Sequence, residues 1–228
     1  DMKMETTDNG LRVINCVVPD DLPIDIRAKL IITLICTDSM GCAAVQIDIL
    51  LAENPEETGD LFWDVGLILC EREYYSEAIK VLNPLMDTQN FNTVALWLKL
   101  SQCYKEIGQI EECHQTYRRA LKDFPEDSEL KLKFCDELIA AQKYREAVEV
   151  TWSKENNISL LIYERCKLYL LLKDYDNFLA SGWQLFRLHC KEIKTSEDYV
   201  IFTSVSTMAK GLQSILSQYV PYVVDTSV

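Results

Sequence analysis

Few residues of this chain have the type and spacing that catalysis requires. The two histidines, His114 and His189, are the only candidates for an imidazole general base, but each lies inside a predicted helix with no serine or cysteine motif beside it. We therefore predict that both are surface or half-buried helix residues. The sequence contains no phosphate loop and no GxSxG, HExxH or GxGxxG motif.

Acidic pairs such as Glu56 and Glu57 fall between predicted helical units. Carboxylates at such places offset the partial positive charge of a helix N-terminus, which explains them without catalysis. The chain is therefore predicted not to be an enzyme, and to have no catalytic residue and no cofactor.

The nine cysteines could in principle bind a metal or form disulfides. Their number is odd, none forms a CxxC pair, and the Cys₂His₂ or Cys₄ spacing of zinc sites is absent. Several of them, Cys113, Cys135 and Cys166, fall at small-residue packing positions of predicted helices. We expect unpaired, buried thiols that suit a reducing compartment, the cytosol or nucleus, and no metal site.

The charge of the chain argues against direct nucleic-acid binding. Its formal net charge is -13, from 36 acidic and 23 basic residues, and no Lys or Arg cluster stands out. Because DNA and RNA binding requires basic side chains that neutralise phosphates, we expect DNA to be contacted mainly through partner proteins. A membrane helix needs roughly 18 to 20 apolar residues, and neither such a run nor a signal-peptide pattern is present.

The elements that position all these residues are helix pairs. In residues 94–127, VALWLKLSQCYKEIGQIEECHQTYRRALKDFPED, large and small side chains alternate along one face of each of two predicted helices. The residues that form this pattern are Trp97, Leu100, Ser101, Tyr104, Gly108, Cys113, Tyr117, Ala120 and Pro125. Gly108 breaks the chain between the helices, and Pro125 ends the second one. This order is typical of a tetratricopeptide repeat, a helix–turn–helix unit of about 34 residues.

The same pattern recurs along the chain. Registers that start at residues 24, 59, 94, 128 and 159 are separated by 35, 35, 34 and 31 residues. We therefore predict an all-α fold, a tetratricopeptide-repeat superhelix (α-solenoid) of about five helix pairs plus a C-terminal helix. The outer two repeats are degenerate, and in the last one Phe178 replaces the usual small residue while Gly182 replaces the usual aromatic residue. Terminal repeats of solenoids are often atypical.

The predicted organisation has three parts. Residues 1–23 form an N-terminal extension or linker, residues 24–192 form the repeat array, and residues 193–228 form a capping helix and tail. The capping helix, 196–218, opens with Ser196 as a plausible N-cap. The residues assigned to packing within the repeats are Gly66, Ala78, Trp97, Tyr104, Gly108, Tyr117, Ala120, Pro125 and Ala147.

A partner surface is predicted on the first helix of each pair, which lines the concave side of such arrays. The candidate partner-binding residues are Trp63, Leu67, Leu98, Gln102, Leu132 and Asp136. The apolar members form a ridge that suits an amphipathic helix or an extended segment with basic flanks. Equally, the chain's own helix at 196–218 could fill it. Arrays that grip a chaperone's C-terminal carboxylates carry Lys, Arg and Asn at such places, so that role is disfavoured.

The amino-acid sequence of the central stretch contains motifs that are more specific than those of a generic repeat. It combines ENPEE-x-GDL at 53–61, Y-x-E-A-I-x-V-L-x-P-L at 75–85 and F-N-x-x-x-x-W-L at 91–98, and LPIDIRAKLIITLI precedes them at 22–35. Over roughly residues 19–216 the chain resembles the tetratricopeptide-repeat subunit of general transcription factor IIIC, in its C-terminal repeat array.

This resemblance implies a nuclear, non-catalytic subunit of the factor that recognises internal promoters of transfer RNA genes for RNA polymerase III. In that family the subunit belongs to the promoter A-box lobe and helps recruit transcription factor IIIB. Other subunits make most of the base-specific contacts with DNA. It also implies that this chain, which begins at Asp1, is a piece of a longer subunit.

Two other functions stay open on the sequence. One is a repeat adaptor of another multi-protein assembly, such as a ubiquitin-ligase or RNA-processing complex. The other is a free-standing receptor for short peptides. All three functions require protein partners, and none requires a small-molecule substrate or a membrane.

Overall fold

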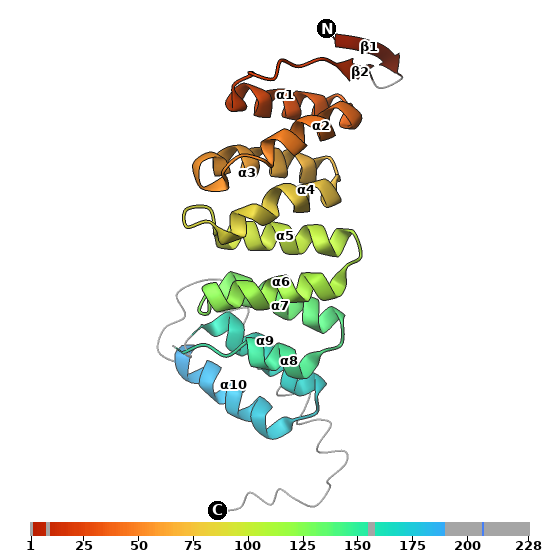
Figure 1. Cartoon of the computed structure of the whole chain (residues 1–228). Helices are drawn as coiled ribbons and strands as arrows, with labels where there is room; N and C mark the ends of the chain where they lie inside the picture. Colours follow the sequence, from red (N-terminus) through yellow and green to blue (C-terminus); the bar gives the residue numbers. More distant parts are fainter. Residues whose placement is uncertain (1, 8–9, 155–157, 190–206, 208–228) are drawn as a thin grey trace, which may run out of the picture. The chain divides into compact units, whose positions relative to one another are not determined.

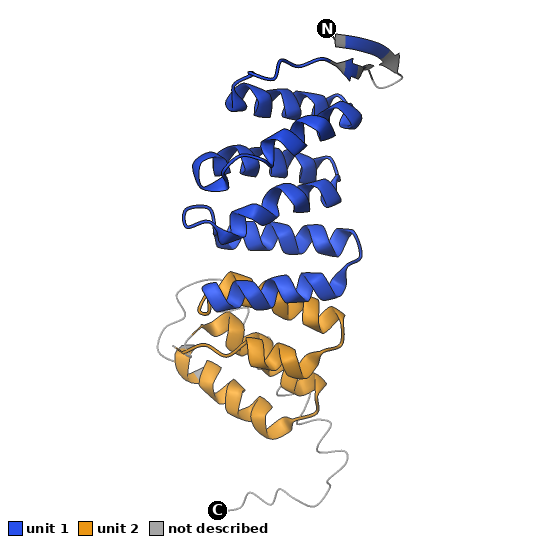
Figure 2. Cartoon of the chain, in the orientation of Figure 1, with its two compact units in different colours: residues 1–124 blue, residues 125–228 orange. Residues whose placement is uncertain are grey.

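The computed structural model describes residues 2–7, 10–154, 158–189 and 207 of the chain, mainly as helices (Figure 1). Two strands come first, β1 (Met2–Thr7) and β2 (Gly10–Cys16). The helices are α1 (Ile24–Cys36), α2 (Met40–Leu50), α3 (Pro55–Glu71), α4 (Tyr75–Leu82), the 3₁₀ helix η1 (Asn83–Asp87), α5 (Val94–Glu106), α6 (Ile110–Asp123), α7 (Ser128–Ala140), α8 (Tyr144–Val150), α9 (Ser159–Leu171) and α10 (Tyr175–His189). The chain divides into two compact units, residues 1–124 and 125–228 (Figure 2).

Consecutive helices pack in pairs within each unit. In the first unit α1 packs on α2, α3 on α4 and α5 on α6, and the pairs join where α3 contacts α1 and α5 contacts α4. In the second unit α7 packs on α8 and α9 on α10, and α9 contacts both α7 and α8. The predicted all-α tetratricopeptide-repeat fold with five helix pairs is thus confirmed. The capping helix predicted at 196–218 lies outside the described residues.

The turn inside every pair has the same backbone geometry. Its key residue has a positive φ, between 52° and 78°, and the five such residues are Asp38, Glu73, Gly108, Gln142 and Lys173. In the second pair the amide of Glu73 donates to the carbonyl of Cys70 (3.1 Å), and the amide of Tyr74 donates to that of Leu69 (2.9 Å). Both bonds recur at equivalent positions in the other four pairs. This is the Schellman arrangement, which satisfies carbonyls that a helix end leaves without partners.

A small or well-fitted side chain follows each of these turns at the same distance. It lies five residues after the positive-φ residue and is at most 1% exposed; the set is Ala43, Ala78, Cys113, Ala147 and Phe178. Gly66 on α3 is also closely packed, because a Cβ atom there would collide with the side chain of Leu82, the last residue of α4. Where these residues are small, the two helices of a pair can approach closely.

Trp97 is the largest fully buried side chain, with 2% of its surface exposed. Its indole Nε1 donates to the Oδ1 atom of Asn92 (2.6 Å), so its one polar atom is satisfied. Tyr117 on the facing helix is also buried, and Tyr104 is half-buried against the core of the first unit. Of the other residues assigned to packing, Ala120 is buried, whereas Gly108 and Pro125 lie exposed in turns.

The N-terminal extension folds as an antiparallel hairpin, β1 with β2, which the sequence analysis did not predict. Strand β2 is anchored to the first pair, because the amide of Val13 donates to Ser39 Oγ (2.7 Å) and the thiol of Cys42 donates to the Val13 carbonyl (3.6 Å). The Asn9-Gly10 step between two short stretches of alternating character is the signal that was overlooked.

The prediction that His114 is a surface or half-buried residue is wrong, since its side chain is fully buried. The stripe of Cys113, Tyr117 and Ala120 suggested a narrow buried face for α6. The buried face also includes His114 and Thr116, so it is wider than the repeat pattern indicated. The side chain of His189 lies outside the described part.

Replacing Trp97 by Ala should lower the free energy of unfolding by about 3 to 5 kcal/mol, because it empties a large aromatic site from a closed core. The exposed Trp183 (61%) offers a matched control, and Trp183→Ala should cost far less. Urea denaturation followed by circular dichroism measures both. Equal losses would show that the helix pairing at Trp97 is wrong.

The turn geometry predicts the effect of a glycine at position 73. A non-glycine residue in the left-handed region costs about 1 to 2 kcal/mol, so Glu73→Gly should be neutral or stabilising by up to about 1 kcal/mol. The control Glu112→Gly, at an exposed helical position of α6, should destabilise by about 1 kcal/mol. If both substitutions destabilise equally, the turn at Glu73 is not left-handed.

Candidate protein-binding face

Four of the predicted partner-binding residues lie on two neighbouring helices of the first unit. Trp63 and Leu67 are on α3, Leu98 and Gln102 are on α5, and we call these four residues the α3–α5 face. Each helix buries a different side in the core. The buried side includes Phe62 and Leu69 in α3, and Leu96 and Leu100 in α5. Trp63, Leu67 and Leu98 are therefore left half-buried, and Gln102 is exposed.

The two helices contact each other directly beside this face. The Sγ atoms of Cys70 on α3 and Cys103 on α5 lie 3.2 Å apart. The helices that carry the α3–α5 face thus lie side by side at this point. Asp60, on the first turns of α3, is exposed and adds negative charge to the same helix.

Trp63 has a structural role besides any role in binding. Its side chain packs against the buried core of the first unit. A truncation at Trp63 would therefore remove packing as well as exposed surface, so its effect on a partner could not be separated from its effect on stability. Leu98 and Gln102 are better positions for testing binding.

The remaining two predicted residues, Leu132 and Asp136, lie on α7 in the second unit. Leu132 is half-buried and Asp136 is exposed. The six residues therefore form two groups, one in each unit, and the role of each group in binding stays a prediction.

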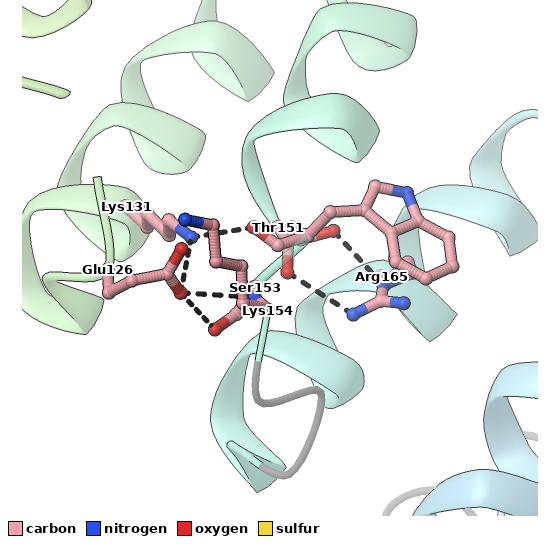
Figure 3. A network of polar contacts seen from close by, with 7 residues as sticks. Glu126, Lys131, Thr151, Ser153, Lys154 and Arg165 are labelled. Carbon is pink, nitrogen blue, oxygen red and sulfur yellow. Dashed lines mark hydrogen bonds and ion pairs between the residues drawn. The ribbon is translucent and has the colours of Figure 1, made fainter. Parts of the chain in front are cut away.

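A polar network fixes the N-terminal end of α7 to the segment after α8 (Figure 3). Lys131, which is buried, donates through Nζ to the carbonyl of Trp152 (2.6 Å) and lies 3.8 Å from Glu126 Oε2. The same carboxylate oxygen accepts from Ser153 Oγ (2.6 Å) and from the amide of Lys154 (3.1 Å). The Ser153 hydrogen bond is the main reason that the pKa of Glu126 lies below its usual range.

Arg165 extends this network from α9. It is buried, and it donates through Nε to Thr151 Oγ1 (3.2 Å) and through Nη2 to the Thr151 carbonyl (3.2 Å). Its guanidinium carbon stands 3.7 Å from the centre of the Trp152 ring, a cation–π contact. Burial lowers the pKa of Arg165, and the hydrogen bonds and the ring offset part of the lost hydration, while its Nη1 atom is buried without a hydrogen-bond partner. Together Lys131 and Arg165 hold the 151–154 turn, and so they position α7.

The sequence analysis missed an apolar surface on α10. Leu179, Trp183 and Leu188 are exposed there, and a shallow hollow of about 430 Å³ is lined by Ala180, Trp183, Gln184, Arg187 and Leu188. The large apolar residues at 179 and 183 stand one helical turn apart, a signal that was available. The repeat pattern draws attention to Phe178 and Gly182 instead, because these two residues depart from the usual types at their positions.

Metal binding and membrane spanning were also considered for the described residues. No group of three or more His, Cys, Asp or Glu side chains among them could hold a metal ion. In the part of the chain that the structure describes, no helix is both long and apolar enough to cross a membrane.

Comparison with known proteins agrees with this geometry. Residues 94–137 match the family model described as tetratricopeptide repeat. The chain has the tetratricopeptide-repeat fold. The match begins at the first residue of α5 and covers α5, α6 and most of α7, which include the repeat that the sequence pattern singled out.

Two curated relatives of this tetratricopeptide-repeat protein are transcription factor subunits. It is 29% identical over 108 residues to general transcription factor 3C polypeptide 3 of Homo sapiens, which is 47% of this chain and 12% of that protein. It is 29% identical over 116 residues to the transcription factor tau 131 kDa subunit of Saccharomyces cerevisiae, 51% of this chain and 11% of that protein. The matched stretch therefore spans about an eighth or less of either relative.

Among solved structures, the tetratricopeptide-repeat protein is similar to Pseudomonas aeruginosa pilF, with 15% identity, a TM-score of 0.42 and coverage of 83% of each chain. It is also similar to a thermophilic tetratricopeptide-repeat protein of Thermus thermophilus, with 16% identity and a TM-score of 0.43, over 81% of this chain and 100% of that one.

The network of the second unit predicts a pH dependence for the stability of this tetratricopeptide-repeat protein. Because the folded state lowers the pKa of Glu126, its contribution is complete above the usual glutamate pKa and is lost as the pH falls through the lowered value. Glu126→Gln should therefore lower the urea midpoint at pH 7 and have a smaller effect at pH 3. Glu129→Gln, an exposed position on the first turn of α7, is the control. An equal effect of Glu126→Gln at both pH values would exclude a role for its charge.

Proposed function

We propose that this chain is a non-catalytic scaffold that joins other protein subunits in a complex of the transcription factor IIIC type. The observation that carries the proposal is the sequence match, over about half of the chain, to subunits of two such factors from human and yeast. The match gains weight because it comes from two distant organisms and because the motifs at 53–61 and 75–85 had suggested the same family. Such a role places the chain in the nucleus, at promoters read by RNA polymerase III, where it helps recruit transcription factor IIIB.

Electrostatics support a protein partner rather than a DNA partner. The net charge of -13 repels phosphates, whereas base and backbone recognition depends on basic side chains. A scaffold of this charge would leave DNA contacts to other subunits. Acidic side chains such as Asp60 would steer a partner segment with basic flanks, which affects its association rate more than its final affinity.

The α3–α5 face supplies the apolar surface that such a partner needs. Half-buried leucines and an aromatic ring on two adjacent helices form anchor points for the apolar side of an amphipathic helix. Contacts of this kind dominate the free energy of binding when they become fully desolvated. The same face would serve an adaptor of a ubiquitin-ligase or RNA-processing complex, so the identity of the co-purifying subunits distinguishes the two functions.

The proposal predicts that Leu98→Asp abolishes association with the complex, because the partner would have to bury an unpaired carboxylate. The tagged chain and its variant are expressed in the cells it comes from, and co-purifying subunits are quantified by mass spectrometry. We expect the wild-type chain to enrich subunits of a transcription factor IIIC complex. The amount recovered with the variant should fall at least about tenfold, which corresponds to a loss of about 1.4 kcal/mol or more of binding free energy. Helical circular dichroism should be unchanged.

Gln115→Asp, at an exposed position on α6, is the matched control and should retain every subunit. If folded Leu98→Asp keeps the complex, the α3–α5 face is not the binding surface. If the wild-type chain enriches ubiquitin-ligase or RNA-processing subunits instead, the proposed complex is wrong, whichever face binds.

A further inference from the structure

Two thiols of consecutive repeats meet where α3 and α5 contact each other. Cys70 lies in the last turn of α3 and is half-buried, while Cys103 lies in α5 and is fully buried. Their Sγ atoms are 3.2 Å apart, close enough for the thiol of one residue to donate a hydrogen bond to the sulfur of the other. They are 33 residues apart in the chain, about one repeat, so the pair bridges two structural units.

The two thiols of this pair are not equivalent. The hydrogen bond from Cys103 lowers the pKa of Cys70, and the nearby Lys99 acts in the same direction against the effect of burial. The same contact, together with burial, raises the pKa of Cys103. Cys70 is thus the partner that ionises and can be reached from solvent, and Cys103 is the partner that keeps its proton.

The buried thiols of Cys135 and Cys166 differ from this pair. Burial raises the pKa of Cys166 to about 12, and burial together with the charges of Glu164 and Asp136 raises that of Cys135 to about 12, which makes these thiols unreactive. Cys36 is exposed on α1. Redox-sensitive cysteines typically combine an accessible thiolate with a second thiol in contact with it, and Cys70 with Cys103 meets both conditions.

We propose that Cys70 and Cys103 form a reversible oxidation site, at which a hydroperoxide converts the thiol pair into a disulfide that joins α3 to α5. The Cys70 thiolate attacks the peroxide oxygen, the O–O bond breaks, and hydroxide leaves as Cys70 becomes a sulfenic acid. The Cys103 sulfur then attacks the Cys70 sulfur, the S–O bond breaks, and water leaves. With hydrogen peroxide, two thiols and one peroxide give one disulfide and two waters. This inference does not depend on the proposed function.

The geometry requires only a small movement. A disulfide has an S–S length of about 2.05 Å, so the two sulfur atoms must approach each other by about 1 Å. The bond would close a loop that contains α4 and η1 and would restrict the movement of the second repeat against the third. In a reducing compartment a disulfide of this kind is transient, because cellular thiols return it to the dithiol.

The test treats the reduced full-length chain with a small molar excess of hydrogen peroxide. The reaction is quenched with acid, the protein is unfolded in guanidinium with N-ethylmaleimide, and tryptic peptides are analysed by mass spectrometry. We expect a cross-linked peptide pair that contains Cys70 and Cys103, has lost two hydrogen atoms, and disappears after treatment with dithiothreitol.

Cys70→Ser should abolish the cross-link, and Cys36→Ser, the control at an exposed thiol, should leave it unchanged. The wild-type measurement decides the question even if a variant fails to fold. The proposal is overturned if both thiols remain alkylated at a peroxide dose that oxidises Cys36. It is also overturned if Cys70 accumulates as a sulfinic acid while Cys103 stays reduced.

Discussion

The close approach of two antiparallel helices within each repeat is the constraint on which this structure depends. It requires a left-handed residue to end the first helix and, five positions later, a side chain that fits against that helix. Both requirements recur from Asp38 and Ala43 to Lys173 and Phe178. Once a pair has closed, its buried faces can pack on the next pair only in one orientation, because close-packed interiors tolerate little change in volume.

This packing decides which side chains of each helix are buried and which stay accessible to a partner. In the first unit one hydrophobic core runs from Val13 in the hairpin to Cys103 in α5. The positions of α3 and α5 that the core does not use remain half-exposed, and they form the α3–α5 face. The same close contact between neighbouring repeats brings Cys70 against Cys103. The candidate binding face and the proposed oxidation site therefore arise from one arrangement.

Local periodicity made the helix pairs predictable from sequence. The large and small positions of the 94–127 repeat have a fixed spacing, and Trp97 and Ala120 are buried as that spacing implies. Even the degenerate last repeat could be aligned, because Phe178 falls five residues after Lys173 and is buried like its counterparts. The binding role of Leu98 and Leu132 could not be settled in this way, since exposure on a helix does not identify what covers it.

Features that depend on distant residues were not predictable. Arg27 is buried because the carbonyls of Pro19 and Asp20 and the side chain of Gln46 accept its hydrogen bonds. Lys131 and Arg165 are buried for the same reason, through the 151–154 turn. A charged side chain at a helix surface position looks solvated in the sequence, and only its tertiary partners show otherwise. The contact between Cys70 and Cys103 likewise joins two repeats, so no local motif revealed it.

Site-specific photo-cross-linking tests the central claim most directly, because it reports both the binding face and the partner. A photoreactive amino acid replaces Gln102 on the α3–α5 face or, as the comparison, Gln115 on α6, and the chain is irradiated in its native complex. The account predicts that position 102 captures another subunit of a transcription factor IIIC complex and that position 115 captures none. Adducts from position 115 alone, or adducts from position 102 with subunits of an unrelated assembly, would contradict it.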